Sequence, residues 1–332
     1  MTISENWTQW TGSDADWDIE LLDFPNYCVY QTTKWGRHRS DFGWAVHRLV
    51  KNGSNSCRAQ ILTKKYFGTT IAWIPGGPIG SWDQLDRTFD KQILRLTTAR
   101  RLYVRLNMLE HDSSDTQSEL LSLGWNKLKH PFTTGISLTC SLNFSETERR
   151  DLLSPNWSRN LRRGESRNLP PYVWTDYNAA EIIDIYNEMA DYKDLAAGAD
   201  VPTAETIESI IKHLDGYLRV VRCDDEHGNP LAIRGALLFG SKAWDTFAAV
   251  TPQGRKQYSS YAATWHLLSS CSVSGISSYD FSGIDPIKNK GVYDFKRGTG
   301  AHEIIYLGEW DRGTPFLIQP LVGRLIRYRR SS

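Results

Sequence analysis

One segment near the C-terminus reads Tyr279-Asp280-Phe281-Ser282-Gly283-Ile284-Asp285, and it continues after four residues as Lys290-Gly291-Val292-Tyr293-Asp294-Phe295-Lys296-Arg297-Gly298-Thr299-Gly300. Its opening residues, 278–281, are typical of a short strand, and the run at 259–274 before them is typical of a helix. Three strand-like runs precede that helix, at 217–222, 231–239 and 243–250. This order of three strands, a helix and another strand predicts a mixed α/β domain.

The first half of the chain repeats this order without a close sequence repeat. Three strand-like runs come first, at 44–50, 56–62 and 68–74, and Pro75-Gly76-Gly77-Pro78 ends the last of them. A helix over 82–98 and a strand over 102–106 follow. At 332 residues the chain also exceeds the size at which a single hydrophobic core stops growing. We therefore predict two domains, 1–145 and 146–332.

Composition excludes several classes of protein. Hydrophobic residues make up 40% of the chain and charged residues 23%, which is typical of a soluble globular protein. With 39 basic and 38 acidic side chains, a nucleic-acid partner would need a local basic patch. The five cysteines are scattered, without CxxC or histidines at zinc-ligand spacing, so we expect no metal site and a reducing compartment. No secretory leader or long apolar run is evident, and we expect a cytoplasmic protein without stable membrane insertion.

The order of elements resembles the acyl-CoA N-acyltransferase (GNAT) fold, and the segment 279–300 is similar to the end of the FemABX family. Members of that family add amino acids to peptidoglycan precursors from aminoacyl-tRNA. Their pattern is a Tyr-Asp-hydrophobic-Gly-Gly strand followed by Gly-Val-Tyr-x-Phe-Lys-x-x-Phe-Gly. Two N-terminal segments, Gln31-x-x-x-Trp35-Gly36 and Ile74-Pro75-Gly76-Gly77-Pro78, resemble the family's Gln-Ser-x-x-Trp element and Pro-Arg-Gly-Pro loop. The resemblance implies an α/β (α+β) fold of two tandem GNAT-like domains with mixed central sheets, the second carrying the Fem-type motif.

The resemblance assigns the catalytic role, or contact with the donor's tRNA end, first to Lys296 and Phe295. A fixed cation stabilises the oxyanion that forms when an amine attacks an ester or thioester carbonyl. Judged alone, Lys296 would be a solvated lysine at a strand end and Phe295 a core residue. Asp280 and Asp285 are candidates for orienting or deprotonating the amine, which must lose a proton before it attacks. Asp280 on a buried strand could instead bind backbone donors, with the substrate moving its own proton.

Four further residues are assigned to substrate binding. Trp35 lies in the N-terminal element, and Arg39 lies where the family often carries a lysine that grips the nucleotide diphosphate of its sugar substrate. Arginine binds phosphate through two donors at once, so this exchange preserves the chemistry. Lys193 lies near the family's second phosphate-binding arginine, and Phe247 lies on a strand where relatives often present an aromatic ring to the acceptor.

The donor is the least determined part of the prediction. Ordinary GNAT enzymes hold the CoA pyrophosphate in a glycine-rich loop at a helix N-terminus. Here the corresponding turn, 251–260, has a single glycine and the bulky run Lys256-Gln257-Tyr258, which favours a larger donor held elsewhere. Nearby basic residues fit aminoacyl-tRNA as that donor, namely Arg162, Arg163, Arg167, Arg255 and Lys256.

Departures from the family pattern bear on the acceptor. Thr299 replaces a Phe, Ser282 replaces a Gly, and Asn107 stands roughly where the family has an acidic residue. The acceptor could therefore be a nucleotide- or lipid-linked sugar precursor instead of a peptidoglycan stem peptide. The C-terminal run 321–330 is a basic amphipathic helix candidate, either a final helix with a charged last turn or a weak attachment to the inner membrane face.

Three hypotheses follow. The leading one is an acyltransferase that forms an amide on an amine of a cell-envelope precursor, peptidoglycan or surface polysaccharide, with aminoacyl-tRNA as donor and no cofactor. The second is the same fold with acyl-CoA or an acyl carrier protein as donor, acting on an amino sugar. The third is a non-catalytic protein that binds a nucleotide-linked sugar or tRNA.

Overall fold

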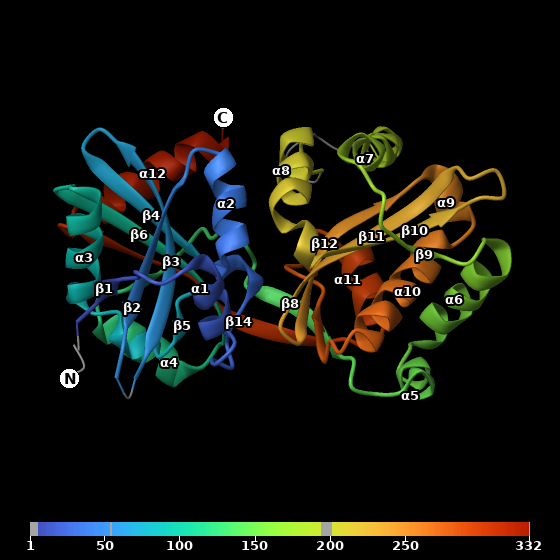
Figure 1. Cartoon of the computed structure of the whole chain (residues 1–332), viewed down its shortest axis with the longest axis horizontal. Coiled ribbons are helices and arrows are strands. Elements are labelled where there is room, and N and C mark those ends of the chain that lie inside the picture. The colour runs from blue at the N-terminus through green and yellow to red at the C-terminus, as the bar shows by residue number, and fades with distance from the viewer. Residues whose placement is uncertain (1–5, 54, 194–200, 332) are drawn as a thin grey trace. The chain divides into compact units, whose positions relative to one another are not determined.

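The computed structural model describes residues 6–53, 55–193 and 201–331, with the side chains of Lys193 and residues 325–331 left undescribed. The chain forms two compact units (Figure 1). Unit 1 comprises Met1–Ile136 and Ile305–Ser332, and unit 2 comprises Ser137–Ile304. This differs from the predicted division after residue 145, because the last residues of the chain return to the first unit.

Unit 1 is built on one mixed sheet with the strand order β1-β2-β3-β4-β6-β14, with β5 paired to β3 and β7 to β14. Its strands are β1 (Thr8–Gln9), β2 (Ala45–Lys51), β3 (Cys57–Tyr66), β4 (Thr69–Pro75), β5 (Ile79–Gly80), β6 (Arg101–His111), β7 (Asn126–Lys127) and β14 (His302–Thr314). Its helices are α1 (Asp14–Leu21), η1 (Val29–Gln31), α2 (Thr33–Asp41), η2 (Trp82–Gln84), α3 (Arg87–Thr97), α4 (Ser114–Ser122) and α12 (Ile318–Ser331). The strands predicted at 44–50, 56–62 and 68–74 are confirmed as β2, β3 and β4.

The β4–β6 pair is the parallel part of this sheet. Seven successive residues pair in register, from Thr69 with Arg101 to Pro75 with Asn107. The crossover between the strands is α3, whose Phe89 and Ile93 pack with the strand residues Ile74 and Val104 in one buried cluster. Parallel strands require such a crossover, and burying the apolar stripe of α3 stabilises it.

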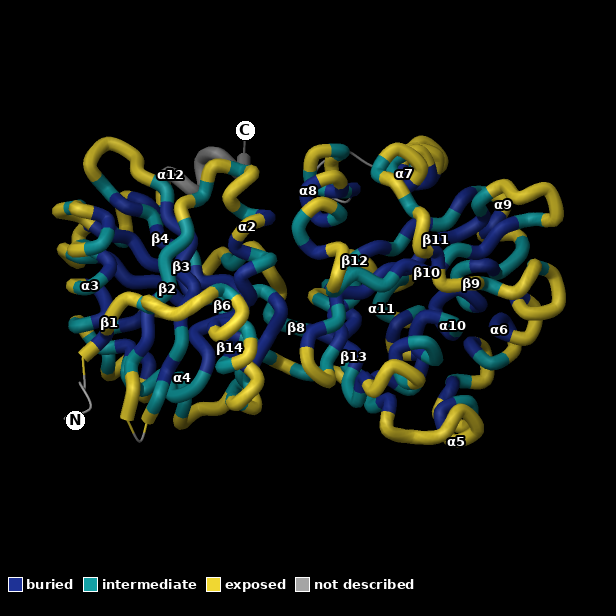
Figure 2. Tube along the Cα trace, in the orientation of Figure 1, coloured by how far each residue is buried: buried dark blue, intermediate teal, exposed yellow. Residues whose placement is uncertain are grey.

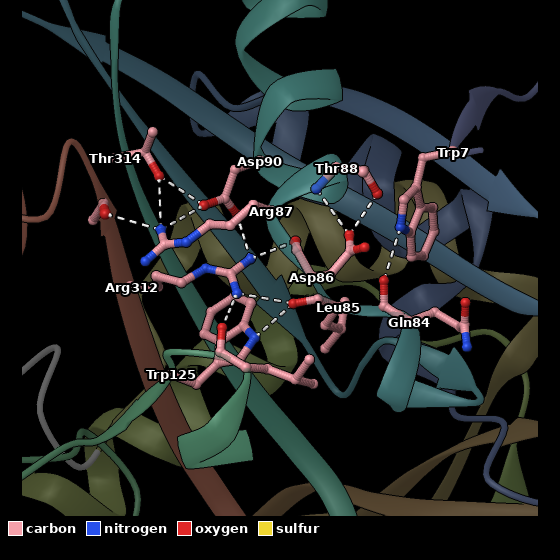
Figure 3. Close-up of polar contacts among 12 residues, drawn as sticks. Trp7, Gln84, Leu85, Asp86, Arg87, Thr88, Asp90, Trp125, Arg312 and Thr314 are labelled. Atoms are coloured by element: carbon pink, nitrogen blue, oxygen red, sulfur yellow. Dashed lines mark hydrogen bonds and ion pairs between the residues drawn. The ribbon is translucent and has the colours of Figure 1, made fainter. Parts of the chain in front are cut away.

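Arg312 explains why the end of the chain belongs to unit 1. Its guanidinium donates to the Leu85 and Leu123 carbonyls at 2.9 Å, and it forms an ion pair with Asp90 of α3 (Figure 3). It also lies 4.0 Å from the Trp125 ring centroid. Because the side chain is 1% exposed, these contacts offset the cost of burying its charge and attach β14 to α3.

Unit 2 is built on a second mixed sheet with the strand order β8-β13-β12-β11-β10-β9. Its strands are β8 (Ile136–Ser141), β9 (Tyr172–Trp174), β10 (Leu218–Asp224), β11 (Pro230–Phe239), β12 (Lys242–Val250) and β13 (Ser278–Asp280). Its helices are α5 (Glu146–Asp151), α6 (Pro155–Arg167), α7 (Ala179–Lys193), α8 (Ala204–Leu214), η3 (Asp215–Tyr217), α9 (Pro252–Lys256), α10 (Ser259–Val273) and α11 (Lys290–Arg297). Helix α10 packs on β10 and β11, and α7 packs on β11 and β12.

Burial follows the central strands of each unit, while hairpin tips and helix surfaces are exposed (Figure 2). The described parts of the chain include no helix long and apolar enough to cross a membrane.

Candidate functional site

The parallel strands of unit 2 separate after a short contact. Strands β12 and β13 pair from Lys242 with Ser278 to Trp244 with Asp280, and β12 then continues to Val250 without β13, paired with β11. A bulge lies beside this separation: the β11–β12 register shifts between Gly235 and Ala236. Side chains bridge the strands there: Ser282 Oγ donates to the Asp245 carbonyl at 2.8 Å, and the Tyr279 hydroxyl donates to Asp245 Oδ1 at 2.7 Å.

Lys296 lies at this point of separation. It is on helix α11, not at a strand end, and it is 7% exposed, which excludes the alternative of a solvated lysine at a strand end. Its ammonium donates to the Phe281 carbonyl, immediately beyond β13. Burial lowers the pKa of Lys296 from its usual range, and the neighbouring Arg234 lowers it further. Asp245 and Asp280 oppose this effect, so the ammonium is surrounded by charges of both signs.

The end of α11 explains two residues of the motif. A Cβ at Gly298 would lie 2.7 Å from Trp157 Cδ1, so only glycine allows α11 to approach α6 this closely. Thr299 Oγ1 donates to the Lys296 carbonyl at 2.7 Å and satisfies a backbone acceptor of the last turn. The threonine that departs from the family pattern thus stabilises the helix end carrying Lys296.

Phe295 belongs to an aromatic cluster. Its ring centroid is 5.0 Å from that of Tyr261 and 5.8 Å from that of Trp157. The Arg234 guanidinium lies 4.9 Å from the same ring and donates to Ser260 Oγ at 3.1 Å. Phe295 therefore connects α11 to the helices α6 and α10 and positions Arg234 next to Lys296.

The two predicted carboxylates bind local donors. Asp280 Oδ1 accepts from the Ser282 amide at 2.7 Å and from the Ser137 hydroxyl. Asp285 Oδ1 accepts from the amides of Ile287 and Lys288, which lowers its pKa. Asp280 thus lies beside Lys296, whereas Asp285 closes a turn before α11. Their roles in proton transfer stay predictions.

Phe247 is a core residue in this structure. It is 1% exposed, and its ring centroid is 6.5 Å from that of Tyr186 on α7. A Cβ at Gly235 would meet Phe247 at 3.0 Å. The packing assigns this ring to the interior of unit 2, and the predicted contact with the acceptor has no support from it.

The N-terminus of α10 is covered by α6. Asn168, at the end of α6, donates to the Gln257 carbonyl at 2.9 Å and accepts from the Ser259 hydroxyl at 2.7 Å. At Gly164 of α6 a Cβ would lie 2.7 Å from the Tyr258 carbonyl oxygen. The turn before α10 is thus occupied by the chain itself, with the short helix α9 in place of a glycine-rich loop.

Exposed cations gather around that turn. The Arg163 and Arg167 guanidiniums each lie 5.3 Å from the Tyr258 ring centroid, and Arg163 also donates to its hydroxyl at 3.0 Å. The group, which we call the α6–α9 basic surface, consists of Arg159, Arg162, Arg163, Arg167, Arg255 and Lys256. A nucleic-acid partner would need a local basic patch of this kind.

Trp35 and Arg39 lie one turn apart on α2, in unit 1. The Arg39 guanidinium carbon is 5.1 Å from the Phe42 ring and 5.5 Å from the Trp73 ring. Arg39 Nε and Trp35 Nε1 are buried without a hydrogen-bond partner, and burial lowers the pKa of Arg39. Two orphaned donors on one helix face are suited to an anionic acceptor. Lys193 ends α7, and its side chain lies outside the described residues.

Two residues of the Lys296 neighbourhood were missed in the sequence. Arg234 and Asp245 each stand in an otherwise apolar strand, 231–239 and 243–250, and a charge in a buried strand marks a functional candidate.

Asn107, which stands where the family has an acidic residue, has an acidic neighbour in the sheet. It pairs with Glu309 of β14. That carboxylate is already engaged by Arg105 and the Phe132 and Thr133 amides. Among the described residues, no His, Cys, Asp or Glu side chains group as a metal site would require.

Comparisons with known proteins agree with this geometry. Residues 202–318, from just before α8 to the start of α12, match the model of the FemAB family. A crystal structure of FemX matches with a TM-score of 0.77 at 15% identity, over 92% of this chain and 96% of that one. A tandem GNAT protein from the clavulanic acid biosynthesis pathway matches with a TM-score of 0.55 at 9% identity, over 93% and 98% of the two chains.

L-PGS from Bacillus licheniformis matches with a TM-score of 0.54 at 12% identity, over 95% of this chain and 97% of that one. No curated protein sequence matches. The predicted resemblance to FemABX proteins and the predicted tandem GNAT-like α/β fold are confirmed.

Proposed function

We propose that the protein is an aminoacyltransferase that forms an amide on an amine of a cell-envelope precursor. The observation that carries this proposal is Lys296, a buried cation in the FemAB-like segment where two parallel strands separate. A buried ammonium in a fixed position stabilises developing negative charge more strongly than a solvated one.

In the proposed reaction the acceptor amine attacks the ester carbonyl of the donor. The new C–N bond forms, and the carbonyl oxygen becomes an oxyanion beside the Lys296 ammonium. The C–O bond to the donor's ribose then breaks, and the proton lost by the amine goes to the ribose oxygen. Lys296 stays protonated throughout, and Asp245 and Asp280 favour that state.

Aminoacyl-tRNA is the donor that fits these surroundings best. The pyrophosphate of CoA would need space at the free amides of the α10 N-terminus, where α6 packs against the Gln257 and Tyr258 carbonyls and the Ser259 hydroxyl. The α6–α9 basic surface supplies exposed arginines beside Tyr258, and such a surface binds the phosphates and bases of a nucleic acid.

The acceptor side of the proposal rests on α2. A phosphate of a nucleotide- or lipid-linked sugar would accept from the buried Arg39 Nε and Trp35 Nε1, and the Trp73 and Phe42 rings would flank it. A guanidinium is well suited to this task because it offers two parallel donors.

The test is a mass measurement on the acceptor. The full chain is incubated with candidate amine acceptors and either charged tRNA or acyl-CoA. We expect a mass gain with charged tRNA. A mass gain with acyl-CoA alone would contradict the proposal and support the acyl-CoA hypothesis. Ligand binding without a mass gain from either donor would support the non-catalytic hypothesis.

Lys296→Met tests the role of the buried cation. We expect turnover to fall by about 10²-fold, the usual cost of removing one oxyanion donor, with the thermal transition nearly unchanged. Lys288→Met is the matched control, because Lys288 is an exposed lysine in the same segment. Equal turnover in the two variants would refute the assignment.

A further inference from the structure

One end of the unit 1 sheet presents apolar side chains without a partner in the described structure. Phe67, at the tip of the β3–β4 hairpin, is 100% exposed, and its φ of 46° is in the left-handed region. Phe316 and Leu317, between β14 and α12, are 71% and 58% exposed. Folding gains nothing from a phenylalanine at a tip where asparagine or glycine has the lower backbone cost.

These segments lie next to one another. Thr69, which follows the tip, pairs with Arg101, and Leu102 pairs with Thr314 at the end of β14. The three strands are adjacent, so the hairpin tip and the β14–α12 junction are separated by only two strand spacings, about 10 Å. Lys65 of the hairpin also donates to Thr98, at the end of α3. The hairpin tip and α12 lie at the same end of unit 1 in Figure 1, and Figure 2 shows the tip exposed.

Helix α12 adds an apolar row to this surface. Ile318 and Val322 are buried against Tyr103 and Ile71. Leu317 and Leu321 follow the same four-residue spacing one position earlier, and Leu321 is 55% exposed. The helix therefore packs Ile318 and Val322 on the sheet, while Leu321 and the preceding Leu317 stay exposed.

The charge in the segments that carry these side chains has one sign. We define the tip surface as residues 62–70, 93–102 and 314–324. These segments contain no Asp or Glu, and their cations are Lys64, Lys65, Arg95, Arg100, Arg101 and Arg324. The whole chain has a net charge of only +1, so the residues outside these segments are net acidic. Exposed hydrocarbon surrounded by cations is the combination that binds the interface of an anionic bilayer.

We propose that the tip surface docks unit 1 on anionic membrane lipid, with the Phe67 and Phe316 rings entering the headgroup layer and the cations contacting lipid phosphates. A nucleic acid is the less suitable partner, because Leu317 and Leu321 would gain nothing from a phosphate backbone. This inference is independent of the proposed reaction, since vesicle binding is measured without donor or acceptor. A lipid-linked acceptor would lie at the same surface.

The experiment is co-sedimentation of the full chain with vesicles that contain phosphatidylglycerol and with vesicles of phosphatidylcholine alone. We expect binding to the first kind only, and weaker binding as salt is raised. Phe67→Asn should lower partitioning by about tenfold, since a buried aromatic side chain is worth about that factor or more. Asparagine tolerates the left-handed backbone, so this variant should fold at least as well as the original chain.

Two further variants separate the apolar and charged contributions. Leu317→Ser with Leu321→Ser should also lower partitioning, and each of Arg100→Gln and Arg101→Gln should lower it about fivefold. Val273→Ser is the control, because Val273 is 90% exposed on α10 of unit 2. The proposal is overturned if both apolar variants bind vesicles as tightly as Val273→Ser. It is also overturned if phosphatidylcholine vesicles bind equally well, or if the variants weaken binding to bulk tRNA while vesicle binding is unchanged.

Discussion

The two units differ in how far their parallel strands pair. In unit 1 the parallel strands β4 and β6 pair over seven residues. On the other side of β4, Gln31 joins β4 to β3, with Nε2 donating to the Pro75 and Gln60 carbonyls and Oε1 accepting from the Gln60 amide. In unit 2 the parallel strands β12 and β13 pair over three residues, and Lys296, Ser282 and Tyr279 occupy the place where pairing stops.

This difference distinguishes the structural strand pair of unit 1 from the candidate site of unit 2. Backbone groups that pair with each other have no capacity left for a ligand, whereas strands that part leave room for charged side chains. Unit 1 accordingly uses its buried charges to join elements, as Arg312 does with α3. In unit 2, Lys296, Arg234 and Asp245 lie close together, and not all of them serve to connect secondary-structure elements.

The largest effect is expected from Arg312→Met, which breaks the joint between β14 and α3. Removing one partner of a buried ion pair costs about 3–5 kcal/mol. We expect the unfolding transition of unit 1 to shift down, with that of unit 2 little changed, in calorimetry of the full chain. Lys91→Met on the exposed face of α3 should leave both transitions in place. If Arg312→Met does the same, the joint contributes nothing.

Gln31→Ala tests the side-chain joint between β3 and β4 in unit 1. The variant removes three hydrogen bonds and leaves buried backbone groups unpaired, so the free energy of unfolding should fall by roughly 3 kcal/mol in urea titration. Gln253→Ala, at an exposed glutamine, is the control. A loss no larger than the control's would mean that Gln31 does not stabilise the contact between β3 and β4.

Ser282 tests the opening in unit 2. Its φ of 61° is a left-handed conformation, and the family pattern has glycine there. Ser282→Ala keeps the backbone strain and loses the bond to the Asp245 carbonyl, so we expect a loss of about 1–2 kcal/mol in stability. Ser282→Gly loses the same bond but relieves the strain, so its loss should be smaller. The reverse order in denaturant titration would contradict this account.

Asp245→Asn should give the smallest effect, seen only in the pH profile. Asparagine can still accept from the Tyr279 hydroxyl, but the variant removes a negative charge near Lys296. The pKa of Lys296, already lowered by burial, should fall further, so the alkaline decline in turnover should move to lower pH. The shift should be below about one pH unit, and an unchanged profile would exclude an electrostatic role for Asp245.

Much of the fold could be predicted from the sequence because its strands are short apolar runs separated by turn residues. The runs 231–239 and 243–250 correspond to β11 and β12 within a residue. Strand β14 was missed, because Glu309, Asp311 and Arg312 interrupt its apolar pattern. Those charges are buried and paired across strands or with α3, and only tertiary contacts make such a segment a strand.

The sequence by itself determined the family resemblance, the central order of three strands, a helix and another strand in each unit, and Lys296 as the leading candidate. These depend on local patterns and on a motif within one continuous segment. Tertiary structure decided that Lys296 is buried on a helix, that Arg234 and Asp245 surround it, and that α6 covers the start of α10. It also decided that the chain's end returns to unit 1. Burial and charge proximity arise between residues far apart in the chain, and no local pattern specifies them.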